Sequence, residues 1–531
     1  MQRLLWRLNK FDKVKDLPEL EGYAPRYDPT VIPVTQGDDE PLPLTELPRP
    51  RQRKNEASYY TTADYHEAYT SGALTPSDVV EFLLPLITRR GKSVGKYAVA
   101  YLDVQPELVR AAARASTERY RAGKPLSMLD GVPIAVKDEV NLKGHKKSLG
   151  SKLDFKDEQD ATDWCVWKWE EAGGIIIGKT NMHELGLDTT NNNPIWGTPL
   201  NPHNENYYTG GSSGGSGCTA AQGICPIVLG VDGGGSIRIP SSWCGLYGLK
   251  TSHNRVSIYP GDVGANSVAV CGPMSPNIDD LALAYRIMAQ PCPEDPINAM
   301  FPQTTSRQAL TNHTPTLHEN EKRYIGIPHD WVALSDPEIQ TTFRAAINHY
   351  TTVLNYTPIP ITIPLQSENE KAFSLTILAE AMTILTPSKI NSLIHPNQIL
   401  LDVSGTHATA QDLIASNRLR ERAMRHMAWL WRQYPGMLVL TPTTPIAGWK
   451  IGKKSDVTDG FGASDADMSL RSMEYSCFGN WIGTPAITCP MGYDRVSGVP
   501  VGIMVCLCLC FPSFLICRVL KQLTTKQTNK S

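Results

Sequence analysis

Residues 207–240 read YYTGGSSGGSGCTAAQGICPIVLGVDGGGSIRIP. This stretch contains glycine clusters at 210–215 and 233–235, and each cluster is accompanied by serine. Glycine at this density lets the backbone adopt positive φ angles and lets a substrate approach main-chain N–H groups closely. Successive N–H groups in such a turn form a concavity that binds negative charge. A serine beside it has the arrangement that an acyl-transfer nucleophile needs, because the N–H groups can receive the oxyanion.

Glycine–serine sequences also occur in flexible linkers, which is the alternative interpretation. Here the two clusters are joined by AAQGICPIVLGVD at 220–232, which predicts a buried helix-to-strand segment rather than a solvated spacer. Asp232 and Arg238 flank the second cluster, where a linker would gain nothing from them. We expect these two residues to brace the loops, and the pattern therefore favours a catalytic site.

The clusters, together with GVPIAVKD at 131–138 and DGGGSIRIPSSWCGLYGLK at 232–250, resemble the signature of the amidase signature family. The resemblance is strongest to the acetamidase-like or general amidases of fungi. It implies an α/β amidase signature fold, in which a mixed central β-sheet is covered by α-helices on both faces. It also implies a Ser–cis-Ser–Lys triad formed by Ser236 as nucleophile, Ser212 as the serine that follows a cis peptide, and Lys137 as base.

Lys137 ends a mostly apolar predicted strand, so we expect its side chain to be partly buried. Burial disfavours the charged form of a lysine, and a neutral amine can act as a base. A lysine that extends from a strand end into water is the alternative, but the two serine clusters favour catalysis. In the implied mechanism Lys137 accepts the proton of Ser212, which accepts that of Ser236. Ser236 then attacks an amide carbon, and water hydrolyses the acyl-enzyme.

The segment GKTNMHELG at 178–186 has a counterpart in the family, where its later residues border the acyl pocket. By this resemblance the substrate is contacted by Gly186, Ser212, Gly233, Gly234, Gly235 and Ser236. Asn181 and Glu184 are interpreted as structural residues that orient loops. His183 and Glu184 could suggest a metal pair, but no partner with ligand spacing follows them, so we predict no metal and no cofactor.

The chain has 531 residues, 51 Lys and Arg against 53 Asp and Glu, and a net charge of −2. It shows no basic stripe, which argues against nucleic-acid binding. We expect a cytoplasmic enzyme with a small-molecule amide substrate, and a homodimer is compatible with the sequence. Cys218, Cys225 and Cys244 are interpreted as free buried thiols, because no CxxC pair occurs.

Three regions are predicted. Residues 1–57 would form a short helix, with Leu4, Leu5, Leu8 and Phe11 on one face, followed by an extended proline-rich arm. Residues 58–505 would form the catalytic domain, with the signature core at about 130–290 and a variable helical region at about 320–435. In the family such inserted helices shape the substrate funnel. Residues 506–531 would be an atypical tail.

The tail departs from the family pattern after residue 502. Met504 stands where the family has glutamine, and four of the twelve cysteines follow it closely. Three interpretations compete: a membrane anchor, which Pro512 and the short uninterrupted run weaken; a divergent ending that packs on the core; or sequence from a retained intron or a shifted frame.

The sequence therefore predicts an amidase that hydrolyses a carboxylic amide to the acid and ammonia or an amine, for nitrogen use or the tailoring of a secondary metabolite. Ammonia delivery to an acceptor is an alternative use of the same chemistry. A catalytically impaired binding or scaffold protein is the alternative from another class, and it is motivated by the tail.

Overall fold

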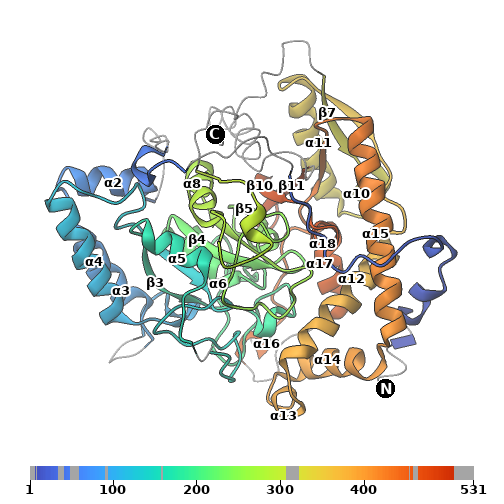
Figure 1. Cartoon of the computed structure of the whole chain (residues 1–531), viewed down its shortest axis with the longest axis horizontal. Helices are drawn as coiled ribbons and strands as arrows, with labels where there is room; N and C mark the ends of the chain where they lie inside the picture. Colours follow the sequence, from blue (N-terminus) through green and yellow to red (C-terminus); the bar gives the residue numbers. More distant parts are fainter. Residues whose placement is uncertain are drawn as a thin grey trace.

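The computed structural model describes residues 6–7, 9–33, 41–47, 59–89, 94–156, 159–305, 322–453, 455–458 and 465–507. In this part of the chain eleven strands form one sheet with the order β1-β3-β2-β4-β6-β5-β10-β11-β9-β7-β8 (Figure 1). The strands are β1 (Tyr101–Asp103), β2 (Pro133–Lys137), β3 (Ile175–Thr180), β4 (Ile227–Asp232), β5 (Tyr247–Lys250), β6 (Val270–Ser275), β7 (Arg323–Ile327), β8 (Tyr356–Pro360), β9 (Leu438–Pro442), β10 (Ala486–Tyr493) and β11 (Pro500–Cys506).

The sheet is mixed. Strand β2 runs parallel to both β3 and β4, and β7 runs parallel to both β8 and β9. Antiparallel pairs connect these two groups through β6, β5, β10 and β11. Parallel neighbours need a crossover connection, and helices α5 and α6 lie in the connections from β2 to β3 and from β3 to β4.

Both faces of the sheet are buried. Along β2, Ile134 and Val136 belong to one apolar cluster, whereas Ala135 between them belongs to another. Alternate side chains of a strand point to opposite faces, so a strand in this position needs apolar residues at nearly every step. This explains the continuous apolar run PIAV before Lys137. The α/β architecture that the resemblance implies is confirmed.

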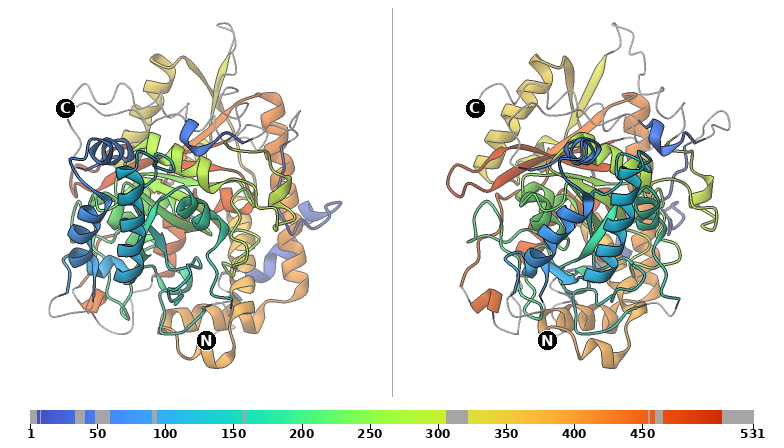
Figure 2. Two further views of the ribbon diagram at one scale, coloured as in Figure 1. Left: turned by 60° about the vertical axis from the view of Figure 1, so that its left-hand side comes forward. Right: turned by 90° about the vertical axis from the view of Figure 1, so that its left-hand side faces the viewer.

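Helices cover the two faces (Figure 2). Helices α2, α5, α8 and α11 contribute to the cluster on one face, and α3, α4 and α6 to the cluster on the other. The described helices are α2 (Thr62–Thr70), α3 (Pro76–Ile87), α4 (Pro106–Arg121), α5 (Trp164–Glu171), α6 (Gly214–Ala221), α7 (Arg238–Trp243), α8 (Ile278–Met288), α10 (His329–Val332), α11 (Pro337–Thr352), α12 (Gln366–Ala381), α13 (Pro387–Ile390), α14 (His395–His407), α15 (Ala410–Gln433), α16 (Ser455–Thr458), α17 (Ala466–Met473) and α18 (Cys477–Trp481).

Helices α12, α14 and α15 stand beside the sheet, at the right of Figure 1, and the beginning of the chain packs against them. The 3₁₀ turn η1 (Phe11–Asp16) contacts α12 and α15. The rings of Trp6 and Phe11 lie 5.1 Å apart, and Trp6 packs with Leu375 and Val403. Of the predicted apolar face, Leu4, Leu5 and Leu8 lie outside the described residues.

The end of the described chain is part of the sheet. Strand β11 pairs with β10 on one side and β9 on the other, so the sheet remains continuous through Cys506. Residues 508–531, on which the three interpretations of the tail depend, lie outside the described residues. Within the described part of the chain, no helix combines the length and the apolar character needed to cross a membrane. Cys218, Cys225 and Cys244 are buried free thiols.

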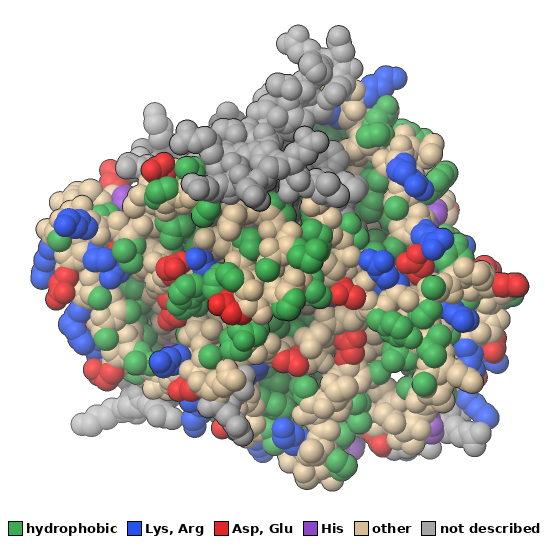
Figure 3. All heavy atoms as spheres, viewed as in Figure 1, with side chains coloured by type: hydrophobic (Ala, Val, Ile, Leu, Met, Phe, Trp, Pro, Cys, Tyr) green, Lys and Arg blue, Asp and Glu red, His purple; other side chains and the backbone are tan. Residues whose placement is uncertain are grey.

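Charges on the surface are mixed. On the face seen in Figure 3, Lys and Arg side chains are interspersed with Asp and Glu. This distribution agrees with the small net charge of the chain.

Candidate active site

Three separate segments bring Lys137, Ser212 and Ser236 to one edge of the sheet. Lys137 is the last residue of β2, Ser212 lies just before α6, and Ser236 lies in the turn between β4 and α7. Because β2 and β4 are parallel neighbours, their carboxyl ends meet at the same edge. The Lys137 Nζ donates a hydrogen bond of 2.8 Å to the Ser212 Oγ. The sequence predicts a partly buried lysine, and the structure buries it almost completely, with 1% of its surface exposed.

The loop before α6 is held against the turn that carries Ser236. The Gly211–Ser212 peptide is cis, as the resemblance implies. The Ser213 N–H donates to the Ser236 carbonyl at 3.2 Å. The Ser213 hydroxyl donates to the Val231 carbonyl at 3.2 Å, so it faces β4. These contacts fix the two serine-bearing loops relative to each other.

Asp232 and Arg238 brace the turn from inside. Asp232 accepts hydrogen bonds from the N–H groups of Gly235 at 2.7 Å and Ile237 at 3.0 Å. Its carboxylate also pairs with the Arg238 guanidinium at 2.9 and 3.0 Å, and both side chains are fully buried. Burial by itself raises the pKa of Asp232, but the Arg238 charge overrides burial and holds that pKa below its usual value. The ion pair therefore fixes the backbone on both sides of Ser236.

Gly235 is the position in this turn that requires glycine. Its φ angle is +140°, and a Cβ atom built there would lie 2.4 Å from the Ser476 Oγ. The Ser476 hydroxyl approaches this closely because it donates a hydrogen bond of 2.6 Å to the Gly234 carbonyl. Ser476, immediately before α18, thus holds the turn from the side opposite to Asp232.

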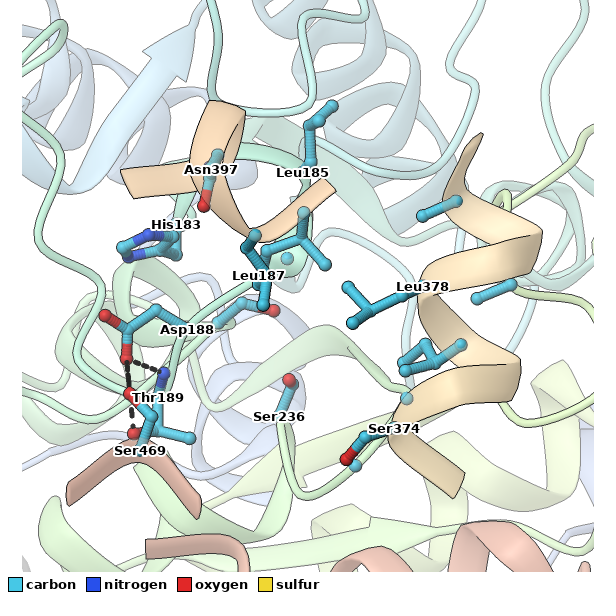
Figure 4. Close-up of a pocket in the computed structure, with 18 of the residues that line it drawn as sticks. His183, Leu185, Leu187, Asp188, Thr189, Ser236, Ser374, Leu378, Asn397 and Ser469 are labelled. Carbon is cyan, nitrogen blue, oxygen red and sulfur yellow. Dashed lines mark hydrogen bonds between the residues drawn. The ribbon is translucent and has the colours of Figure 1, made fainter. Parts of the chain in front are cut away.

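A cavity of about 560 Å³ opens in front of these loops. The predicted residues Lys137, Gly186, Ser212, Gly233, Gly234, Gly235 and Ser236 all line it. The Ser236 hydroxyl points into the cavity, between the loop that follows β3 and helix α12 (Figure 4). Gly186 has a φ angle of +73°, and a Cβ atom there would lie 3.3 Å from the Ser212 Oγ. The structure thus brings together every residue that the sequence predicts for the site.

Most of the cavity wall is apolar, and much of it comes from the variable helical region and the beginning of the chain. Helices α12 and α14 contribute several of the apolar side chains, and η1 contributes Phe11. The apolar lining residues include Phe11, Leu185, Leu187, Ile239, Phe373, Ile377, Leu378, Ala381, Ile384, Ile399, Leu400, Val403 and Met473. Sequence reasoning placed specificity in the helical region but assigned none of that region's side chains to the cavity.

One wall of the cavity is polar. The Asp188 carboxylate accepts a hydrogen bond from the Thr189 N–H and one of 2.7 Å from the Ser469 hydroxyl (Figure 4). His183 lies beside Asp188, and burial lowers the pKa of its imidazole. These contacts join α17 to the loop after β3, so this wall is held by side chains far apart in the sequence.

Two residues of this loop have structural contacts. The Asn181 side chain donates to the carbonyl groups of Val99 and Gly197. Glu184 accepts from the Ile394 N–H at 2.8 Å and from Asn397 at 2.9 Å, which attaches the loop to the start of α14. Both agree with the loop-orienting role expected from the sequence. Among the described residues, no group of three or more His, Cys, Asp or Glu side chains is positioned to hold a metal ion.

Sequence reasoning missed Glu139. Its Oε2 lies 2.6 Å from the Lys137 Nζ, and only 10% of its side-chain surface is exposed. It also lines the cavity. The available signal was its position two residues after the lysine, but β2 ends at Lys137, so strand periodicity does not predict the contact.

Comparison with known proteins identifies the family. The sequence matches the amidase family over residues 83–506, most of its length. It is also 33% identical over 455 residues to the fatty acid amide hydrolase of Medicago truncatula, which covers 84% of this chain and 73% of that protein. The chain belongs to the amidase family. It is therefore an enzyme that acts on amide C–N bonds.

Further relatives agree with this assignment. The amidase is 28% identical over 507 residues to the fatty acid amide hydrolase of Arabidopsis thaliana, which covers 92% of this chain and 81% of that protein. The solved structure of a bacterial aryl acylamidase of the amidase signature family superposes with a TM-score of 0.73, covering 88% of this chain and 97% of that chain at 22% identity. At 22% identity, the similarity to the aryl acylamidase structure shows a shared fold only.

Proposed function

We propose that this amidase hydrolyses amides of long-chain, apolar carboxylic acids, with Ser236 as nucleophile, Ser212 as proton relay and Lys137 as base. The observation that carries the proposal is the buried 2.8 Å contact between the Lys137 Nζ and the Ser212 Oγ, beside Ser236 at the wall of an apolar cavity. A buried amine next to a hydroxyl is the pairing that activates a serine without a His–Asp pair.

The reaction has two halves. Neutral Lys137 accepts the proton of Ser212 while Ser212 accepts that of Ser236, and the Ser236 Oγ forms a bond to the amide carbon. The relay then returns a proton to the departing amine, and the C–N bond breaks to leave an acyl-enzyme. Water attacks this ester with the same relay as base, which releases the carboxylic acid and restores Ser236.

The oxyanion is stabilised by main-chain N–H groups of the turn that carries Ser236. The Gly235 N–H donates to Asp232 at 2.7 Å, so the groups assigned to the oxyanion are those of Gly233, Gly234 and Ser236. Removing one such donor typically costs on the order of 10²–10³ in rate.

The acyl chain is assigned to the apolar part of the cavity. A volume of about 560 Å³ with this lining suits an aliphatic chain, and ligand cavities usually measure roughly 300–1,000 Å³. The relative in Medicago truncatula is named for fatty acid amides, which supports the same substrate class. The acetamidase-like resemblance of the sequence would instead favour a short acyl group, so acyl length is the property to measure.

A series of primary amides from two to sixteen carbons tests the assignment. We expect kcat/KM to rise by about fourfold for each methylene that enters the cavity, which corresponds to about 0.8 kcal/mol of buried CH₂. If acetamide were hydrolysed as fast as the long-chain amides or faster, the long-chain assignment would be wrong. The enzyme would then resemble the acetamidase-like amidases in its substrate preference. Absence of hydrolysis in folded protein, at every length, would favour the binding or scaffold alternative.

A bulkier side chain on α12 tests where the acyl chain of the substrate binds. Leu378 is buried and faces the cavity opposite Asp188 (Figure 4). We expect Leu378→Trp to lower kcat/KM for a sixteen-carbon amide by about tenfold or more, because a filled cavity excludes the terminal methylenes. Hydrolysis of the shortest accepted amides should change by less than about twofold on the same reasoning.

Leu334 provides a matched control for this substitution. It is 53% exposed and does not line the cavity, so Leu334→Trp should leave the length profile unchanged. If Leu378→Trp lowered kcat/KM equally for short and long amides, the substitution would have damaged the site in general. That result would contradict the placement of the acyl chain against α12.

A further inference from the structure

The Lys137 Nζ has three oxygen-bearing neighbours. They are the Ser212 Oγ at 2.8 Å, the Val231 carbonyl at 3.1 Å and the Glu139 carboxylate at 2.6 Å. Glu139 is buried, and apart from Lys137 its Oε2 has no partner among the described residues. A carboxylate taken out of water without a hydrogen-bond partner is costly, so its position against this lysine calls for an explanation.

We propose that Glu139 is a positioning residue that orients the Lys137 amine toward Ser212 and stabilises the ammonium formed when Ser236 attacks. The inference rests on the proposed function, because it assigns Glu139 a task in the Ser236–Ser212–Lys137 relay. Nothing in the amidase assignment itself requires an acidic residue at this position.

The geometry explains the orientation. A charged lysine has three N–H donors and no acceptor. The Ser212 Oγ and the Val231 carbonyl accept hydrogen bonds from two of them, and the Glu139 carboxylate lies against the amine as an ion pair. A neutral amine has two N–H groups and one lone pair. The Val231 carbonyl keeps one N–H group of this amine and the Glu139 carboxylate attracts the other, which leaves the lone pair facing the Ser212 Oγ. This is the direction from which the relay proton arrives.

The charge explains the second task. During attack the Ser236 proton moves to the Ser212 Oγ, and the Ser212 proton moves to the Lys137 lone pair. The new bond joins the Ser236 Oγ to the amide carbon, and the carbonyl electron pair moves to oxygen. Lys137 thereby becomes an ammonium 2.6 Å from a carboxylate in a site with little water, where opposite charges attract strongly.

Among the charged groups nearby, Glu139 is the one placed to stabilise the Lys137 ammonium. Asp138 forms its own ion pair with Lys179 at 3.1 Å, and burial lowers the pKa of His183 so that this imidazole stays neutral. The other titratable groups that interact electrostatically with these residues are Lys147, Asp103 and Asp163 with Lys179, Asp188 with His183, and Cys271 with Glu139. Of these carboxylates, Glu139 is the one that forms a described ion pair with Lys137.

The test measures how fast a fluorophosphonate labels Ser236 between pH 5 and pH 10 in the full-length chain, with the adduct mapped by mass spectrometry. This readout requires an activated Ser236 but no knowledge of the natural amide. Three variants separate the two tasks: Glu139→Gln keeps an acceptor but removes the charge, Glu139→Ala removes both, and Glu139→Asp keeps the charge. Circular dichroism verifies that each variant is folded.

We expect the labelling rate of Glu139→Gln to rise at a pH about 1–3 units lower than in the wild type, because the ammonium loses its counter-charge. Its plateau rate should fall by about tenfold, because the base is weaker. Glu139→Ala should show a lower plateau than Glu139→Gln, since its amine is no longer oriented. Glu139→Asp keeps the charge on a shorter side chain, so its profile should lie between those of the wild type and Glu139→Gln.

Two results would overturn the inference. The first leaves the proposed function standing, and the second contradicts the proposed function as well. If Ser236 is labelled and the Glu139→Gln profile superposes on that of the wild type, Glu139 has no part in the relay and the proposed function stands. If Ser236 of the folded wild type is not labelled at any pH, the triad and this inference both fail.

Discussion

We expect Ser236→Ala to lower kcat for amide hydrolysis by on the order of 10⁵–10⁶-fold, because removal of a nucleophile costs about as much as removal of a whole triad. The Ser236 hydroxyl points into the cavity, whereas its carbonyl accepts the Ser213 N–H, a contact that alanine keeps. The fold of the turn should therefore be retained. Steady-state hydrolysis of a long-chain amide and fluorophosphonate labelling measure the loss.

Ser213 offers a matched control one residue from Ser212. Its hydroxyl donates to the Val231 carbonyl, and the residue does not line the cavity. Ser213→Ala removes this hydrogen bond and the long one of 3.4 Å that the hydroxyl accepts from the Val231 N–H. It should keep activity within about tenfold, because both bonds are neutral and a neutral hydrogen bond contributes only about 0.5–1.5 kcal/mol. Residual hydrolysis above about one per cent in purified Ser236→Ala would show that another group performs the attack, since loss of the nucleophile should cost far more than that.

Part of this site could be predicted because its signals are local. The glycine clusters lie within 210–215 and 233–235, and a strand of apolar residues precedes Lys137. Each pattern specifies a turn or a strand end without reference to distant residues. The resemblance then supplies the expectation that the three segments meet, and the parallel pairing of β2 with β4 brings about that meeting.

The cavity wall could not be predicted because its signals are not local. Phe373, Ile377 and Leu378 lie on α12, and apolar residues on a helix are typical of packing against a core. Only the position of the whole helix relative to the turn that carries Ser236 distinguishes a core residue from one that lines a cavity. Phe11 illustrates the same point, since it lies near the beginning of the chain and far from Ser236 in sequence.

Met504 shows how the structure accommodates a departure from the family pattern. The sequence has methionine where the resemblance predicts glutamine, yet β11 still pairs on both sides. The Met504 Sδ lies 3.2 Å from the Arg238 Nη1, which also donates to the Ser476 carbonyl at 2.8 Å. The guanidinium thus retains a strong acceptor, and the weak thioether acceptor takes the place of an amide.

The second large effect is expected for Asp232→Asn. Both members of the Asp232–Arg238 pair are fully buried, so loss of the carboxylate charge leaves the guanidinium uncompensated. Breaking a buried pair in this way typically costs about 3–5 kcal/mol. The free energy of unfolding should fall by about that amount, and the Gly235 and Ile237 N–H groups would lose their charged acceptor. Thermal unfolding and the Ser236 labelling rate measure the two consequences.

The double variant Asp232→Asn with Arg238→Gln separates charge from geometry. If the uncompensated guanidinium causes the instability, removing it as well should recover a large part of the lost free energy, because neither variant side chain is charged. Labelling of Ser236 should stay slow, since the turn still lacks the carboxylate that accepts the Gly235 and Ile237 N–H groups. Recovery of the labelling rate together with stability would mean that Arg238, rather than the Asp232 contacts to the backbone, sets the position of the nucleophile.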